Sequence, residues 1–196
     1  MRRVGDVSEN RRDEDRAGGV MFRTVVVAAV LLGAWAQGAA VKAPAAPDPI
    51  LVLETAKGTI EIRLFRSDAP KSVDHLLELM KRNFYRGQRF HRATASLVQV
   101  GDPMSRDMSR KDYWGTGNSG SPIGVFELSK KRSHVRGAVG LAHSGNPLGA
   151  DSQIYIMKTA SPGLDGKHAI VGQVTSGMDV VDKIVVTDMI KNATVK

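Results

Sequence analysis

The stretch that decides the fold runs from residue 50 to residue 64 and reads Ile-Leu-Val-Leu-Glu-Thr-Ala-Lys-Gly-Thr-Ile-Glu-Ile-Arg-Leu. Ile60, Ile62 and Leu64 alternate with polar or charged neighbours, and this period of two is typical of a strand with one buried and one solvated face. Residues 50–55 form a largely apolar run, which Ala56-Lys57-Gly58 separates from the second run. The stretch therefore predicts a β-hairpin.

Further short strands and two helices are expected after this hairpin. Val73, Leu76 and Met80 recur at helical spacing after Pro70, and Asp68 is expected to cap that helix. A second helix is predicted over residues 177–184. The remaining strands are predicted at residues 88–92, 97–100, 125–128, 138–142, 153–157 and 169–174. Residues 50–196 are thus expected to form one mainly β domain, a closed antiparallel β-barrel of about eight strands capped by two α-helices.

Residues 1–49 differ in composition from the rest of the chain. Residues 1–20 are charged, lack apolar periodicity and are expected to be disordered. Residues 21–36 have a short positive start, an apolar core and the small-residue end Ala34-Trp35-Ala36, which together predict a signal peptide. Residues 37–49 are expected to be a Pro/Ala linker. Met1 and Met21 are both candidate starts, and if Met21 is used, the charged extension is not translated.

The signal peptide predicts an exported protein, either periplasmic or secreted, with no stable membrane association after cleavage. The alternative is a membrane anchor through residues 24–41, because apolar and small residues continue beyond residue 36.

Composition excludes several kinds of chemistry. The chain has no cysteine, which rules out disulfides, thiolate metal sites and a cysteine nucleophile. Its histidines show no paired metal-ligand spacing, so no metal is expected. The net charge is +8, but the basic residues are scattered without interleaved aromatic residues, so no nucleic-acid partner is predicted. Residues 115–120 fit the pattern G-x-G-x-x-G, but a strand pattern follows them, so we interpret them as a surface loop and expect no cofactor.

Four short motifs carry the functional prediction: Phe90-His91-Arg92, Gln99-Val100-Gly101-Asp102, Ser152-Gln153-Ile154-Tyr155-Ile156 and Leu164-Asp165-Gly166-Lys167-His168. Each is weak by itself, since an arginine that ends a strand is usually a surface ion-pair partner and a tyrosine in a strand is usually core. Their order and spacing together resemble the active-site face of the cyclophilin-type peptidyl-prolyl isomerases. The resemblance covers residues 50–187, which is most of the chain.

The resemblance implies an enzyme that rotates X-Pro peptide bonds in exported polypeptides. It implies catalytic roles for Arg92, whose guanidinium would stabilise the twisted imide, and for Gln99, which would orient Arg92 and contact the substrate backbone. The substrate-binding residues that it implies are Phe90, Ser96, Leu97, Leu141, Ala142, His143, Tyr155, Leu164 and His168. Tyr155 stands where the family has a phenylalanine at the floor of the proline pocket. The expected partners are proline-containing polypeptides, and the protein is expected to be a monomer.

The chain departs from the family pattern between Arg92 and Gln99, where it has one residue fewer and lacks a Pro-Gly turn. Leu97 matches a family methionine, whereas Ser96 falls where a pocket phenylalanine is usual. The alternative function is therefore a catalytically weak peptide-binding module or chaperone of the same fold. The retention of Arg92 and Gln99 favours the enzyme.

Overall fold

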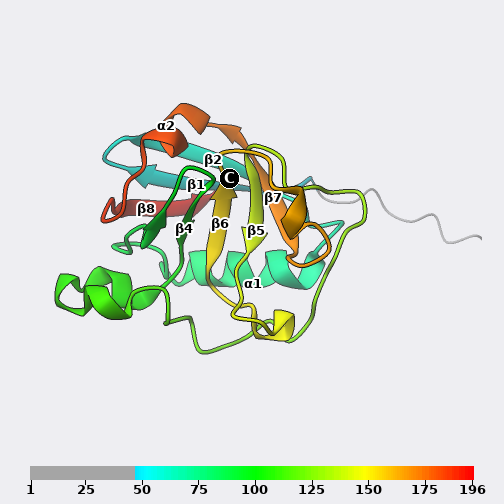
Figure 1. The fold of residues 1–196 in the computed structure, drawn as a ribbon, viewed down its shortest axis with the longest axis horizontal. Helices are drawn as coiled ribbons and strands as arrows, with labels where there is room; N and C mark the ends of the chain where they lie inside the picture. The colour runs from blue at the N-terminus through cyan, green and yellow to red at the C-terminus, as the bar shows by residue number, and fades with distance from the viewer. Residues whose placement is uncertain (1–46) are drawn as a thin grey trace, which may run out of the picture. The chain divides into compact units, whose positions relative to one another are not determined.

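Residues 47–196, which the computed structural model describes, form a curled antiparallel sheet of eight strands with two α-helices against it (Figure 1). The strands are β1 (Ile50–Thr55), β2 (Gly58–Leu64), β3 (Arg92–Ala93), β4 (Leu97–Val100), β5 (Ala138–Leu141), β6 (Ile154–Met157), β7 (Ile170–Ser176) and β8 (Ile190–Val195). Their order in the sheet is β3-β4-β6-β5-β7-β2-β1-β8. The predicted extension, signal peptide and most of the linker lie outside the described residues.

The predicted hairpin is confirmed. β1 and β2 pair along their whole length, from Ile50 opposite Arg63 to Thr55 opposite Gly58. β8 pairs with the free edge of β1, and β7 pairs with β2. The alternation in this stretch therefore places Ile60, Ile62 and Leu64 in the core, where each is 0 % exposed.

The mainly β fold class is confirmed, and the barrel closes only in part. β3 and β8 are the two ends of the sheet, and they meet through an isolated bridge between Arg89 and Met189. Gly87 donates its backbone N–H to the carbonyl of Ile190 at 2.8 Å, and Ile190 donates its own to Gln88 at 2.8 Å. The expected strand over 88–92 is thus used mostly for this closure, and only its last residue belongs to β3.

The helix α1 (Pro70–Lys81) lies across one end of the sheet and α2 (Met178–Lys183) lies near the other, as Figure 1 shows. The prediction that Asp68 caps α1 is wrong: Ala69 is the N-cap, and the Asp68 carboxylate instead accepts from the Arg132 guanidinium at 2.7 Å. The N–H groups of the first turn need an acceptor, and Glu127 provides it. Its carboxylate accepts from Lys71 N at 3.1 Å and Ser72 N at 2.8 Å.

This cap explains why the strand predicted over 125–128 is absent from the described structure. The segment crosses the N-terminus of α1, where Glu127 turns its side chain toward the helix and Phe126 packs against the core.

β8 takes the eighth place in the sheet, although its sequence did not predict a strand. Its buried residues Ile190 and Ala193 are three apart, and a register shift opposite Glu54 and Thr55 breaks the period of two.

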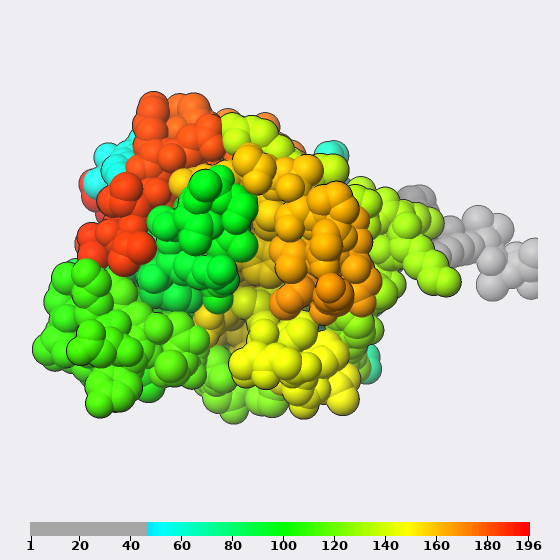
Figure 2. All heavy atoms as spheres, viewed as in Figure 1, coloured from blue at the N-terminus to red at the C-terminus, as the bar shows by residue number. Residues whose placement is uncertain are grey.

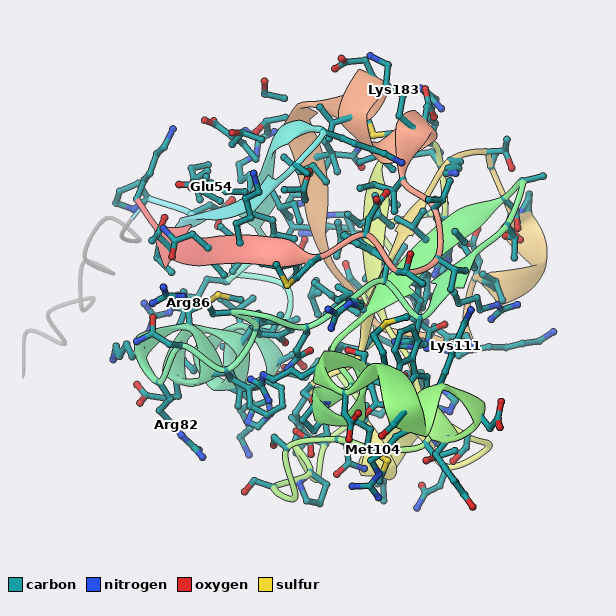
Figure 3. All side chains as sticks on the ribbon, turned by 90° about the vertical axis from the view of Figure 1, so that its left-hand side faces the viewer. Glu54, Arg82, Arg86, Met104, Lys111 and Lys183 are labelled. Atoms are coloured by element: carbon teal, nitrogen blue, oxygen red, sulfur yellow. The ribbon has the colours of Figure 1, made fainter. Side chains whose placement is uncertain are left out.

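Alternation along the central strands divides the buried side chains between two clusters. Val98, Ile154 and Ile156 point into the main core between the sheet and the helices, whereas Leu97, Tyr155 and Met157 belong to a second cluster on the opposite face. Four 3-10 turns complete the fold: η1 (Pro103–Arg106), η2 (Met108–Tyr113), η3 (Pro147–Gly149) and η4 (Pro162–Leu164). Met104 of η1 and Lys111 of η2, labelled in Figure 3, mark a lobe beside the sheet. No helix within residues 47–196 is long and apolar enough to cross a membrane.

Candidate active site

A cavity of about 240 Å³ opens on the face of the second cluster, and we call it the smaller cavity. Figure 2 shows this face hollowed between the green β3–β4 hairpin and the orange segment that leads into β7. The residues that line the cavity are Arg92, Leu97, Gln99, Ala142, His143, Tyr155, Leu164 and His168. All eight are predicted site residues, and the fold brings them together from four separate stretches of the chain: 92–99, 142–143, 155 and 164–168.

The register of the sheet explains how the polar and aromatic members meet. Arg92 on β3 lies opposite Gln99 on β4, and Gln99 lies opposite Tyr155 on β6. Gly140 on β5 lies opposite Tyr155 on the other side. Residues that pair directly across antiparallel strands project from the same face of the sheet. A single cross-strand row therefore carries a cation, an amide and an aromatic ring along one side of the cavity.

Arg92 has an exposed side chain with no hydrogen bond or ion pair to any residue that the structure describes. Gln99 does not hold it: the Gln99 side-chain nitrogen donates to Gln153 Oε1 at 2.8 Å. The Gln153 side-chain nitrogen is in turn held by the carbonyls of Gly115 and Gly117, at 3.0 and 2.7 Å. The amide of Gln99 is thus fixed in place, while the guanidinium beside it stays available.

The floor of the smaller cavity is apolar and closely packed. Tyr155 is 3 % and Leu97 is 7 % exposed, and Leu164 packs against the same cluster. The Tyr155 hydroxyl bonds to His134 Nε2 at 2.7 Å, away from the cavity lining. Burial raises the pKa of Tyr155, so the hydroxyl stays protonated.

Two stacked histidines, His143 and His168, lie at the rim of the same cavity. The rings of His143 and His168 lie 4.2 Å apart between centroids, and the His168 ring meets the Tyr155 ring edge-on at 5.7 Å. His143 Nε2 donates to the Lys167 carbonyl at 2.9 Å, and His168 Nδ1 donates to the Leu141 carbonyl at 3.1 Å. Burial lowers the pKa of His168 below its usual value, which favours the neutral ring at pH 7.

A larger cavity of about 360 Å³ adjoins the smaller one and shares Gln99, Ala142 and His143 with it. Its remaining lining residues are Gly115, Thr116, Asn118, Ser144, Gly149, Asp151 and Gln153. Asp102 positions the glycine-rich loop: its buried carboxylate accepts from Gly115 N at 2.5 Å and Met104 N at 2.7 Å. Gly101 has φ +117°, and a side chain there would overlap the carbonyl of Ser152, which precedes β6.

The sequence comparisons identify the family. The family model described as cyclophilin type peptidyl-prolyl cis-trans isomerase/CLD matches residues 50–196. The chain belongs to this family. A probable peptidyl-prolyl cis-trans isomerase of Brucella suis is 37 % identical over 180 residues, which cover 89 % of this chain and 91 % of the relative. A peptidyl-prolyl cis-trans isomerase of Helicobacter pylori is 36 % identical, over 71 % of this chain and 82 % of the relative.

Solved structures agree on the fold. The crystal structure of a cyclophilin from Cryptosporidium parvum superposes with a TM-score of 0.65 at 22 % identity, over 76 % of this chain and 97 % of that one. The present cyclophilin is thus a mainly β isomerase of the same fold, and enzymes of its family act on proline-containing peptides.

Three predicted site residues do not line the cavity of this cyclophilin. Phe90 is 0 % exposed, because its backbone bonds to Thr187 and Asp188 where the barrel closes and its ring packs into the main core. Leu141 is 2 % exposed, since alternation turns it inward and turns Ala142 outward. Ser96 is exposed in the β3–β4 turn, where Thr94 Oγ1 accepts from its N–H at 3.2 Å.

Sequence reasoning missed the larger cavity and the residues behind the floor. Thr116 and Asn118 lie in the G-x-G-x-x-G stretch, which the structure shows to be a loop between η2 and an extended segment. Gln153 and Asp165 belong to motifs that were recognised, but the residue pattern alone does not show what they bond to. Within residues 47–196, no group of three or more His, Cys, Asp or Glu side chains has the arrangement of a metal site.

Proposed function

We propose that this cyclophilin catalyses X-Pro rotation by placing the Arg92 guanidinium against the imide nitrogen of a proline seated on Tyr155. The observation that carries the proposal is the free Arg92 cation in the same cross-strand row as the apolar floor. Adjacent strands are about 5 Å apart, so the backbone of Arg92 lies about 10 Å across the sheet from Tyr155. A proline ring and an extended arginine side chain span that width.

The physical reason is a change in the substrate nitrogen. The peptide bond resists rotation by about 18–20 kcal/mol because the nitrogen lone pair is delocalised into the carbonyl. In the twisted transition state the lone pair returns to nitrogen, which then accepts a hydrogen bond. A fixed donor aimed at that nitrogen stabilises the transition state more than the planar ground state, which is the requirement for catalysis.

The surrounding residues support the same assignment. Leu97, Tyr155 and Leu164 offer an apolar surface that suits a proline ring. Ala142, which directly follows β5, and His143 line both cavities. The Ala142 N–H is bonded to the Gln153 carbonyl, so we assign the contact with the substrate backbone to the remaining main-chain groups of these two residues. Gln99 is held by Gln153 and presents its amide oxygen for the substrate backbone. Flanking substrate residues would then occupy the larger cavity.

The decisive experiment compares turnover of one X-Pro peptide, measured by NMR exchange, in the wild type and in Arg92→Ala. We expect kcat/KM to fall about a hundredfold, as for loss of one transition-state donor. Arg92→Lys should recover only part of the loss, since an ammonium lacks the rigid fork of donors. Arg63→Ala, which removes an exposed strand arginine on β2, is the matched control and should retain full activity. Wild-type turnover in folded Arg92→Ala would contradict the mechanism.

We also propose that the enzyme works on exported polypeptides, because residues 21–36 have the pattern of a signal peptide. Uncatalysed X-Pro isomerisation takes tens to hundreds of seconds, which is slow enough to limit the folding of exported chains. N-terminal sequencing of the protein recovered from outside the cytoplasm should show a mature chain that begins near Gln37. A membrane-bound chain that retains residues 24–36 would show that the segment is an anchor.

A further inference from the structure

The floor of the smaller cavity is connected to two residues that lie outside it. His134 is 1 % exposed and is sandwiched by hydrogen bonds between Asp165 and Tyr155. Its Nδ1 lies 2.6 Å from Asp165 Oδ1, and its Nε2 lies 2.7 Å from the Tyr155 hydroxyl. The backbone N–H of His134 donates to the same Asp165 oxygen at 2.7 Å. Three residues from three different segments thus form one chain of short hydrogen bonds.

The chemistry of the end groups fixes the direction of these bonds. An ionised carboxylate can only accept, so His134 carries a proton on Nδ1, and in the neutral imidazole Nε2 is then the acceptor. The hydrogen bonds from His134 also lower the pKa of Asp165, which keeps that carboxylate ionised. With this neutral tautomer the Tyr155 hydroxyl donates to His134 Nε2. Its polar end is satisfied behind the floor, and the cavity meets only the ring.

The same chain joins the floor to the wall. Asp165 directly follows Leu164, which lines the smaller cavity, and lies three residues before His168 at its rim. The Tyr155 ring also packs closely against Gly140 of β5. A side chain at position 140 would overlap the hydroxyl end of the ring. The segment 164–168 and the tyrosine ring are consequently tied to each other through one buried imidazole.

We infer that His134 and Asp165 are positioning residues for the proline pocket, holding the Tyr155 ring and the 164–168 segment in one fixed arrangement that recognises the proline ring. The inference rests on the proposed function. It explains how a tyrosine can serve at the floor of an apolar pocket: its hydroxyl is bound to His134 and does not face the substrate. The pocket floor contacts the proline ring equally in the planar ground state and in the twisted transition state. Displacing the Tyr155 ring should therefore raise KM and leave kcat nearly unchanged.

Two substitutions of His134 separate the two halves of the chain. In His134→Asn the amide can still donate to Asp165, but it is too short to reach Tyr155. In His134→Gln the side-chain oxygen can take the place of Nε2 and accept from Tyr155. We expect His134→Asn to raise KM about five- to tenfold with kcat within about twofold, and His134→Gln to restore KM to near the wild-type value. Adding His134→Asn to Tyr155→Phe should raise KM no further, because the bond is already lost.

Tyr85→Phe is the matched control. Tyr85 is 0 % exposed, and its hydroxyl donates to the Ser152 carbonyl at 2.7 Å, so the variant removes a comparable buried bond away from both cavity linings. It should lower Tm without changing KM. If His134→Asn behaves like Tyr85→Phe, with a lower Tm and unchanged KM, the positioning role is wrong while the proposed function stands. If the wild type does not accelerate exchange of the peptide, the proposed function itself fails.

A spectroscopic measurement tests the bond directions independently. ¹⁵N NMR of the His134 ring at neutral pH should show a protonated Nδ1 and an unprotonated Nε2. A ring protonated on Nε2 would overturn the inference, since Tyr155 could not then donate to it.

Discussion

At the floor of the smaller cavity Tyr155 is 3 % exposed and its hydroxyl is bonded to His134. At the rim, by contrast, the Arg92 side chain is exposed and bonds to no other residue that the structure describes. The two side chains belong to the same cross-strand row, only two strands apart. A buried, fully bonded group contributes to the stability of the fold, and a free cation contributes little to it. In the proposed mechanism this difference corresponds to a division of roles, with the floor binding the proline ring and Arg92 acting in turnover.

The largest expected effect is on the stability of the fold, for a substitution at the floor. Tyr155→Ala removes a buried ring and leaves His134 Nε2 without a donor, so we expect the free energy of unfolding to fall by about 3–5 kcal/mol. Arg92→Ala should change it by less than about 0.5 kcal/mol. Urea denaturation followed by circular dichroism measures both. Equal losses for the two variants would remove the distinction between floor and rim.

Gln99 lies between Arg92 and Tyr155 in the cross-strand row, and its substitution should have an intermediate effect on stability. Gln99→Ala removes the bond to Gln153 and the amide oxygen that we assign to the substrate backbone. We expect kcat/KM to fall about fivefold, the size of one hydrogen bond, and the unfolding free energy to fall by about 1 kcal/mol. NMR exchange and denaturation of the same sample test this. A loss as large as that of Arg92→Ala would mean that Gln99 takes part in the transition state.

Lowering the pH should destabilise the folded protein through His168 at the rim. Burial lowers the pKa of His168 in the folded protein, while in the unfolded chain it returns to its usual value of about 6.5. The unfolded state therefore binds more protons below that pH, and stability should fall as the pH drops from 7 to 5.5. Burial lowers the pKa of His91 as well, so His168→Gln should flatten the decline only partly. A pH-independent Tm over this range would contradict both shifts.

The smallest effect is expected at Ser96. Its side chain is exposed in the β3–β4 turn and bonds only to Thr94 Oγ1, at 3.2 Å. Ser96→Ala should therefore change kcat/KM by less than about twofold and leave Tm almost unaltered. Peptide exchange and a thermal melt are sufficient. A clear loss of turnover would show that the hairpin turn reaches the substrate and that the rim extends beyond Arg92.

The motifs by themselves determined most of what lines the smaller cavity. Arg92, Gln99, Tyr155, Leu164 and His168 all line it, and all were assigned from the resemblance of short runs to the cyclophilin pattern. Such runs are informative because local chemistry limits which residues can serve there: a rigid cation, an amide and an apolar ring. The period of two in residues 50–64 likewise determined the first hairpin, since alternation depends only on neighbours along the strand.

Tertiary structure decided everything that depends on partners distant in the chain. Glu127 replaces Asp68 as the acceptor at the start of α1, although 56 residues separate it from Lys71. Phe90 is in the core and β8 is the eighth strand because of the tertiary fold; the local sequence pattern predicted neither. The same holds for the bonds that join Asp165, His134 and Tyr155: the sequence does not show these partnerships, which form only when the sheet brings the three side chains within hydrogen-bond distance. Periodicity records which face a residue prefers, whereas a buried polar group requires a specific partner that only the complete fold supplies.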